Sequence, residues 1–393
     1  MSWVRPIARG WIVRGEVPGP DVDEFAEPDR IVDALRRTNA RTLLAVQHPH
    51  RTPAARARGL GLLDALPDAR TTLTLLLSTH YRGVTDVVAP YEVDGPDGTA
   101  CGVLCLVDPA AVDAEGIGRV RHSEEVYPDV VAERAEALTG LGYATSAAML
   151  VPVGEHDTLT GAVRANTAGK PPAVSTVDSS GRRHRLWLLG PGPDRESLLA
   201  AVAANPLMVA DGNHRVAAAA AAGLDGMLAL VTAGPALRIG AFHRVLTGTG
   251  LTADDLERAW RAQGLDVERL DHADPPGEPG TAAVRCPQGT LVVRLPDGMD
   301  HAVVEDVLIH AALGIDPEGP HVRPLAGDRT PPSTADVVLL LAPVPLRDVL
   351  AVHAAGGRMP RKSTYFTPKP RSGLLLAALG GRPLVPGPSP TVD

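Results

Sequence analysis

Short apolar runs alternate with polar breaks rich in proline and glycine along the whole chain, and their spacing predicts a mixture of helices and strands. In the first region, residues 1–115, the apolar spacing predicts helices at 27–38 and 53–66, and strands at 42–47, 71–77, 85–93 and 100–107. We therefore expect this region to form an α/β unit.

The middle region, residues 116–235, continues the alternation. It is expected to contain helices at 128–139 and 194–204, strands at 147–153 and 184–189, and an exposed polar loop at 164–183. Residues 207–223 (LMVADGNHRVAAAAAAG) predict a strand, a tight turn and a helix that stops at Gly223.

The third region, residues 236–380, is expected to contain helices at 252–262 and 301–313, strands at 282–286 and 290–295, and a strand and helix within 336–354. The Pro-rich tail at 381–393 is predicted to be disordered. The predicted fold class is α/β to α+β, with the strand order left open.

Composition narrows the class of protein. Hydrophobic residues make up 44% of the chain and charged residues 21%, a balance typical of globular proteins. The formal charge of −8 argues against a nucleic-acid partner. No apolar run is long enough for a membrane span, and the N-terminus has no signal-like stretch. Three cysteines fit a reducing cytoplasm, and Cys101 and Cys105 are expected to be half-buried strand thiols.

The turn at residues 211–215 carries the most chemistry. Gly212 allows a tight bend and close approach of a ligand to the backbone, and the first turn of the following helix has unpaired N–H groups and partial positive charge. His214 and Arg215 lie where side chains can close over an anion, and a guanidinium matches phosphate geometry. These features predict a phosphate site.

Asp211 does not suit a pure anion site, since its carboxylate would repel phosphate. It is expected to cap the helix, to bind Mg²⁺ or to accept a proton from a hydroxyl, and that combination suits phosphoryl transfer. The alternative is structural: Asp-Gly is a common turn and Asp a common helix cap.

Several motifs resemble those of the domain-of-unknown-function-1015 family over roughly residues 4–380. ADGNHRVAAAA at 210–220 resembles the family's ADGHHR turn and Ala-rich helix, with Asn213 in place of a His. Other similar segments, in the right order, are VRP at 4–6, RHSEEV at 121–126, HRLW at 184–187, LRIGAFHRVL at 237–246 and MPRKSTYFTPKPRSGLLL at 359–376.

This turn and the preceding His-Glu segment are also similar to those of the archaeal free serine kinases, which have a ParB/sulfiredoxin-like core. The resemblance implies such a core at residues 116–235, with α/β regions on either side. It implies a kinase that uses ATP or ADP with Mg²⁺, a nucleotide and a small molecule as partners, and Glu124 and His122 at the site. Ser123 stands where the family has its usual Glu, so Glu124 serves as base only if the loop shifts by one residue.

The C-terminal signature supplies further candidates. Lys362, Ser363, Thr364 and Lys369 offer two cations and two hydroxyls within eight residues, a set that suits a phosphate or carboxylate site. Arg244 is the Arg that FHR at 242–244 retains from the family's Tyr-Asn-Arg, and it is expected at the phosphate as well. The structural alternative is a Pro-rich segment that only holds domains together.

Three functions stay open at this point. The first is a small-molecule kinase with Glu124, Asp211 and His214 as catalytic residues. The second is a ParB-like nucleotide-binding switch, and the third is a binding module without activity, which the Ser at 123 favours.

Overall fold

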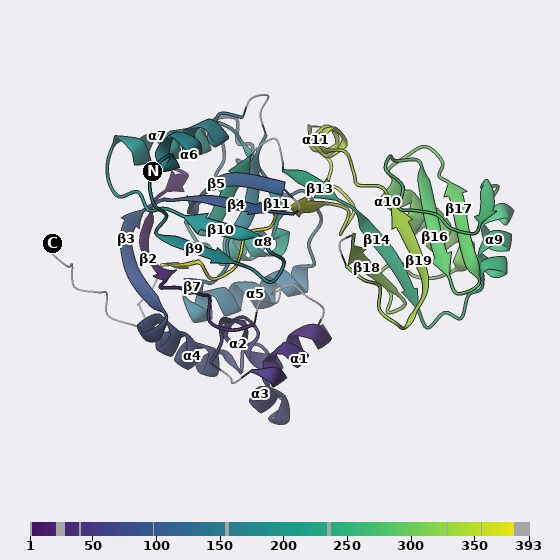
Figure 1. The fold of residues 1–393 in the computed structure, drawn as a ribbon, viewed down its shortest axis with the longest axis horizontal. Coiled ribbons are helices and arrows are strands. Elements are labelled where there is room, and N and C mark those ends of the chain that lie inside the picture. The colour runs from purple at the N-terminus through teal and green to yellow at the C-terminus, as the bar shows by residue number, and fades with distance from the viewer. Residues whose placement is uncertain are drawn as a thin grey trace. The chain divides into compact units, whose positions relative to one another are not determined.

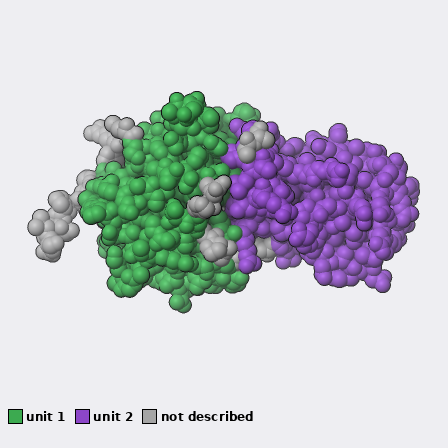
Figure 2. All heavy atoms as spheres, turned by 90° about the horizontal axis from the view of Figure 1, so that it is seen from above, with its two compact units in different colours: residues 1–122, 126–237, 368–393 green, residues 123–125, 238–367 purple. Residues whose placement is uncertain are grey.

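Residues 2–20, 28–38, 41–96, 98–153, 157–233, 237–327, 329–354 and 356–380 are described by the structure, a computed structural model. The chain divides into two units, shown in Figure 2. Unit 1 comprises residues 1–122, 126–237 and 368–393, and unit 2 comprises residues 123–125 and 238–367.

A nine-stranded mixed sheet forms the centre of unit 1 (Figure 1). Its order is β6 (Val120–Arg121), β11 (Leu207–Asp211), β8 (Ala148–Pro152), β12 (Met227–Ala233), β5 (Gly98–Val107), β4 (Ala89–Gly95), β10 (Arg183–Leu186) and β9 (Val174–Val177), with β1 (Val4–Arg5) also paired to β5. A second sheet has the order β3 (Tyr81–Val87), β2 (Ile7–Val13), β21 (Leu375–Ala378) and β7 (Tyr143–Ala144).

Successive side chains of strand β5 point to opposite faces of the sheet, and both faces are buried. Ala100 and Leu104 face the core shared with the second sheet, whereas Cys101, Val103 and Cys105 face the core beneath helices. The two thiols share one face, as their spacing predicts, and helices cover that face, so both are fully buried rather than half-buried.

The helical segments of unit 1 pack around these sheets. They are α1 (Pro28–Arg37), α2 (Leu43–Gln47), η1 (Pro49–Arg51), α3 (Pro53–Ala57), α4 (Leu66–Thr79), α5 (Pro128–Leu141), α6 (Leu159–Thr167), α7 (Pro193–Ala203) and α8 (Asn213–Ala221). Leu159 and Val163 of α6 and Leu198 of α7 pack on the Cys101 face of β5.

Unit 2 is built on an antiparallel six-stranded sheet (Figure 1). Its order is β15 (Val267–Leu270), β17 (Gly289–Arg294), β16 (Thr281–Cys286), β19 (Ala335–Leu341), β14 (Phe242–Thr247) and β18 (Val322–Ala326). Strands β13 (Arg238–Gly240) and β20 (Tyr365–Thr367) form a separate ribbon, and the helical segments are α9 (Ala253–Ala262), α10 (Asp300–Val303), the π-helical η2 (Val304–Ala311) and α11 (Leu346–Ala354).

Most elements expected between residues 120 and 262 are confirmed. In the first region of the chain, two predicted strands are wrong. Residues 43–47 form helix α2, because the side chain of the preceding Thr42 accepts a hydrogen bond from the Ala45 N–H and caps the helix. Residues 71–77 lie in helix α4, where leucines three and four positions apart, such as Leu73, Leu76 and Leu77, are buried on one face.

Other boundaries differ for local reasons. The strand expected at 85–93 is divided between β3 and β4, near Asp86, whose φ of 53° departs from strand geometry. The loop expected at 164–183 contains the end of α6 and strand β9.

The boundary expected near residue 115 falls within unit 1, because β5 from the first region pairs with β12 from the second. The tail expected at 381–393 lies outside the described residues. Within the described part of the chain, no helix has both the length and the apolar character needed to cross a membrane.

Candidate functional site

The turn at 211–215 joins β11 to α8, as the sequence predicts. Gly212 has a left-handed backbone with φ 93°, and a Cβ atom there would lie 2.6 Å from Nε of Arg215. Glycine is therefore required by the backbone conformation, whereas a Cβ atom would only displace the flexible end of the Arg215 side chain, which folds back over the turn. Gly223, with φ 65°, follows the end of α8, as expected.

Asp211 is held between two cations. One carboxylate oxygen lies 2.6 Å from Nη2 of Arg215, and the other lies 2.7 Å from Nζ of Lys369. All three side chains are less than a quarter exposed, so water screens these pairs only in part. Arg215 also donates from Nη1 to the Ala147 carbonyl at 2.5 Å. The carboxylate thus fixes two cations close to the beginning of α8.

Lys369 is a partner of Asp211 that motif reading placed only in the C-terminal signature. The two residues are 158 positions apart, so nothing local joins them. The one available signal was composition, because the chain has only three lysines. The structure therefore links the C-terminal signature to the 211–215 turn through Lys369.

Two histidines bracket the turn. His122 Nδ1 lies 3.2 Å from Oδ1 of Asn213, and since an amide oxygen only accepts, the histidine donates. His214 Nε2 accepts a hydrogen bond from the Tyr127 N–H at 3.1 Å, and the two rings stack with centroids 5.7 Å apart. His214 is therefore the tautomer with its proton on Nδ1. Sequence reasoning did not single out Tyr127.

The donor set at Asp211 does not fit the Mg²⁺ expected there. Both carboxylate oxygens already meet cations. Among the residues that the structure describes, no three His, Cys, Asp or Glu side chains gather in a way that suits a metal ion.

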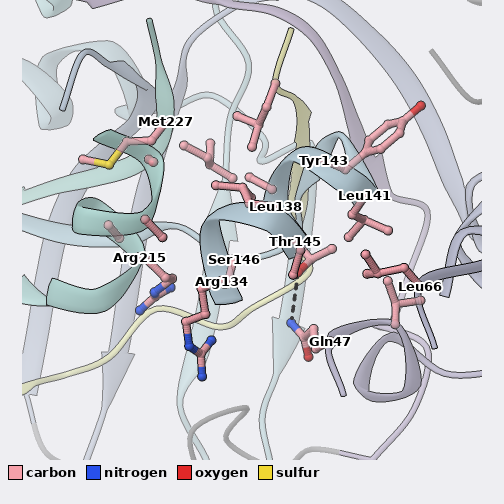
Figure 3. A pocket seen from close by; sticks show the side chains of 18 of the residues that line it. Gln47, Leu66, Arg134, Leu138, Leu141, Tyr143, Thr145, Ser146, Arg215 and Met227 are labelled. Carbon is pink, nitrogen blue, oxygen red and sulfur yellow. Dashed lines mark hydrogen bonds between the residues drawn. The ribbon is translucent and has the colours of Figure 1, made fainter. Parts of the chain in front are cut away.

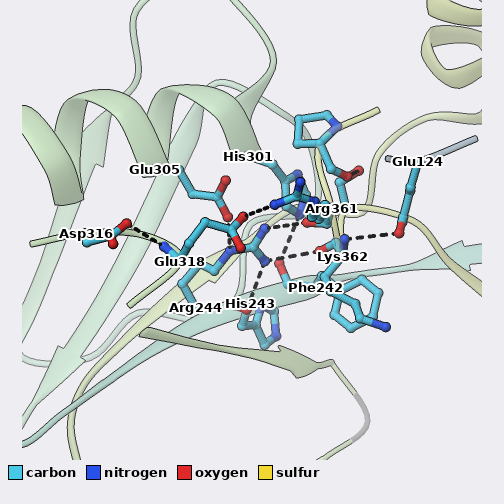
Figure 4. A network of polar contacts seen from close by, with 12 residues as sticks. Glu124, Phe242, His243, Arg244, His301, Glu305, Asp316, Glu318, Arg361 and Lys362 are labelled. Carbon is cyan, nitrogen blue, oxygen red and sulfur yellow. Dashed lines mark hydrogen bonds and ion pairs between the residues drawn. The ribbon is translucent and has the colours of Figure 1, made fainter. Parts of the chain in front are cut away.

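In unit 2, Glu124 holds the segment at 360–364 (Figure 4). One oxygen accepts the Lys362 N–H at 3.2 Å, and the other accepts the N–H and hydroxyl of Thr364 at 3.2 and 2.8 Å. Lys362 has a φ of 53°, which is uncommon outside glycine and typical of functional turns. The segment therefore already binds one anion, which is a carboxylate of the chain itself.

Ser363 takes no part in that contact. Its side chain is fully buried, and its hydroxyl donates to the Pro360 carbonyl at 2.7 Å. Ser123 is also buried, and its carbonyl accepts the Met359 N–H at 2.7 Å. Ser363 and the backbone of Ser123 thus shape the segment from within.

Arg244 lies beneath the same segment and is only 1% exposed. Its guanidinium pairs with Glu305 at 2.7 Å and donates to the carbonyls of Lys362 and Arg361, each at 3.1 Å, and to that of His243 at 3.2 Å (Figure 4). All of these partners belong to the protein, so the geometry assigns Arg244 to holding the segment rather than to a ligand.

Two buried histidines pack near Arg244. His243 accepts the Leu341 N–H, and His301 donates to the Phe242 carbonyl. Burial first, and then the charge of Arg244, lower the pKa of His243 to about 4 and that of His301 to about 3. Both rings are therefore neutral at physiological pH.

Tyr365 and Phe366 follow the segment and are buried. Phe242 packs edge-on against Tyr365 with ring centroids 5.4 Å apart. These rings anchor β20 within unit 2.

The fold and the two turns define a mixed α/β protein with candidate anion-binding segments. The profile of the family described as "Protein of unknown function (DUF1015)" matches residues 86–305, which is more than half of the chain. The protein belongs to this family, and the profile match is shorter than the coverage expected from the motifs. No curated protein matches the sequence.

Solved structures that match this chain include three with low sequence identity. "Free serine kinase in complex with AMP" has 13% identity and a TM-score of 0.39, covering 67% of this chain and 87% of that one. "SbnI with C-terminal truncation from Staphylococcus aureus" has 15% identity and a TM-score of 0.42, with 70% and 87% covered. A conserved hypothetical protein from Pyrococcus furiosus has 13% identity and a TM-score of 0.38, with 67% and 90% covered. Likeness at this level does not establish a shared activity.

Proposed function

We propose that the protein is a nucleotide-dependent small-molecule kinase that phosphorylates the hydroxyl of a hydroxy acid or an amino acid. The observation that carries the proposal is the 211–215 turn, in which Asp211 fixes Arg215 and Lys369 beside the beginning of α8. Two cations and one carboxylate leave a net positive charge there, and the helix dipole adds to it. The motif resemblance in residues 121–126 and 210–220 supports the same reading, together with a ParB/sulfiredoxin-like core.

In the proposed reaction, the acceptor hydroxyl oxygen bonds to the terminal phosphorus of ATP or ADP. The bond from that phosphorus to the bridging oxygen breaks, and the electron pair leaves with the shorter nucleotide. Arg215, Lys369 and the N–H groups at the start of α8 stabilise the charge on the phosphate oxygens. Gly212 allows the nucleotide phosphates to approach the backbone closely. The hydrogen-bonded pair of His122 and Asn213 lies at the same turn.

The base that takes the acceptor's proton is Glu124, the role that the motif resemblance in residues 121–126 implies. A carboxylate has about four lone-pair sites, and three hydrogen bonds from Lys362 and Thr364 occupy part of them. One site remains to accept a proton, so the contact with the segment orients the base. Lys362 and Thr364 then act by positioning Glu124, Ser363 shapes the segment to which they belong, and His214 acts as a donor from Nδ1.

A second candidate is a nucleotide- or phosphate-binding protein without turnover. The observation that favours it is the same set of three hydrogen bonds, since the anion-holding segment is filled by Glu124, together with Ser123 in the place of the family's usual Glu. Such a protein binds nucleotide at the 211–215 turn and releases it unchanged.

Calorimetric titration with ADP tests the nucleotide site. Arg215→Gln is expected to weaken ADP binding about tenfold or more, because it removes one cation that the phosphates contact. Arg183→Gln is the matched control, since Arg183 is exposed on β10, away from the turn. Equal affinity in both variants contradicts the assignment of the turn, and circular dichroism verifies that both variants are folded.

A further inference from the structure

Unit 1 contains a pocket of about 140 Å³ next to the 211–215 turn (Figure 3). Its walls come from α2, α4, α5, α8 and the strand ends beside them. The pocket is independent of the segment at 360–364, because every residue that lines it belongs to unit 1.

The body of the pocket is apolar. Leu66, Leu138, Leu141 and Tyr143 contribute side chains on one side, as Figure 3 shows, and Met227 lies on another. Cavities of about 150 Å³ lined by aliphatic side chains accept benzene. The space therefore matches an apolar group of about six carbon atoms, which is much larger than the side chain of serine.

The charged groups of the pocket are all positive. Arg134 and Arg215 line it, and in Figure 3 their guanidinium groups lie toward the side away from Tyr143. Among the described residues that line the pocket, none is Asp or Glu. Because Arg215 is already paired with Asp211, the charge that favours a negative ligand group comes mainly from Arg134, and the lining offers an ammonium group no carboxylate.

The surroundings extend this positive character. The pKa of His50 is lowered, first by burial and then by the charges of Arg51 and Arg134. Arg134, which lines the pocket, is one of the charges that lower this pKa, so its positive charge acts beyond the pocket lining.

We infer that this pocket binds a small organic acid whose apolar body has about the size of a benzene ring and whose carboxylate meets Arg134 and Arg215. Arg215 belongs to both the pocket and the 211–215 turn. Under the proposed kinase function, the acceptor is a hydroxy acid with an apolar body rather than serine. This assignment of the acceptor rests on the kinase proposal.

Binding of four probes to the full chain tests the inference without requiring turnover. Phenyllactate and phenylpropionate carry the ring and the carboxylate, phenylethanol lacks the carboxylate, and L-serine lacks the ring and carries an ammonium group. Ligand-observed NMR and calorimetry are expected to rank the two acids at least about tenfold above phenylethanol and L-serine. Equal binding of all four probes, or preference for L-serine, overturns the inference.

Two pairs of variants locate the binding. Ala137→Phe places a ring in the pocket from α5 and is expected to abolish phenyllactate binding, whereas Ala132→Phe on the exposed face of the same helix is expected to leave it unchanged. Arg134→Gln is expected to weaken it about tenfold, with exposed Arg56→Gln as the control of equal charge. Phenyllactate binding that Ala137→Phe does not change contradicts the pocket assignment.

The pocket and the kinase proposal fail separately. Phenyllactate that binds at the pocket but is never phosphorylated supports the inference and counts against the kinase. Phosphorylation of L-serine, without binding of the aromatic acids, supports the kinase and overturns the pocket.

Discussion

Replacing Arg244 with methionine is expected to destabilise unit 2 strongly and to leave nucleotide binding in the folded protein unchanged. The guanidinium is 1% exposed and bonds Glu305 and three backbone carbonyls. Methionine has a similar length but no donor, so Glu305 loses its partner and the carbonyls lose theirs.

The magnitude follows from the burial. Removing one partner of a buried ion pair costs ~3–5 kcal/mol, because the remaining charge is left uncompensated. Glu305 is 22% exposed, so water recovers part of this cost, while each orphaned carbonyl adds to it. We expect a loss of about 4 kcal/mol, a large share of the ~5–15 kcal/mol that stabilises a domain.

Urea unfolding measured by amide hydrogen exchange resolves the two units. Peptides from β14 and β19 report unit 2, and peptides from β5 and β12 report unit 1. Arg258→Met is the control, since Arg258 is 73% exposed, pairs only at the surface and is expected to change the free energy of unfolding by less than ~0.5 kcal/mol.

A change of less than about 1 kcal/mol in the stability of unit 2 would contradict a structural role for Arg244. A stable Arg244→Met variant that loses ADP binding would contradict it as well, since Arg244 would then contact the nucleotide, as the sequence motif suggested.

Three further perturbations concern the two buried histidines, Asp211 and Glu124. Lowering the pH from about 7 to about 5 is expected to destabilise unit 2 by roughly 3–4 kcal/mol in urea titrations. His243 and His301 have pKa values depressed to about 4 and about 3 and stay neutral in the folded protein, while the unfolded state takes up protons below about 6.5. His301→Gln is expected to remove about half of this dependence, and a flat profile contradicts the neutral assignment. Asp211→Asn is expected to tighten ADP binding several-fold in calorimetry, since it removes the one negative charge between two cations. The same variant is expected to lower turnover. Weaker ADP binding would mean that Asp211 mainly holds the turn together. Glu124→Gln is expected to lower turnover about 10²–10⁴-fold, because an amide cannot take the acceptor's proton. The control is Glu125→Gln at an exposed position, which is expected to leave the rate within about twofold. Equal rates in the two variants would show that Glu124 is not the base.

Local patterns predicted the parts of the fold that depend on neighbouring residues. The strand, Gly212 turn and Ala-rich helix were predicted correctly, because the turn needs a left-handed residue and the helix a strong former. Residues 71–77 were misassigned because their threonines favour a strand in isolation, whereas burial of Leu73 and Leu76 on one face decides for a helix.

Contacts between distant residues could not be predicted from pattern. The pairing of Asp211 with Lys369 and the binding of Glu124 to Thr364 join positions 158 and 240 apart. The motif resemblance named Glu124 and Thr364 separately, but only the structure gives their partners. Arg244 illustrates the reverse case, since a conspicuous cation in a motif is occupied by protein carbonyls.

Phosphorus NMR of the wild-type protein with ATP or ADP and a set of hydroxy acids and hydroxy amino acids decides whether the protein is a kinase. We expect a phosphomonoester signal that needs nucleotide and acceptor together, and that is lost in Arg215→Gln but kept in Arg183→Gln. Nucleotide that binds at the 211–215 turn and stays unchanged with every acceptor would contradict the kinase and favour the binding protein.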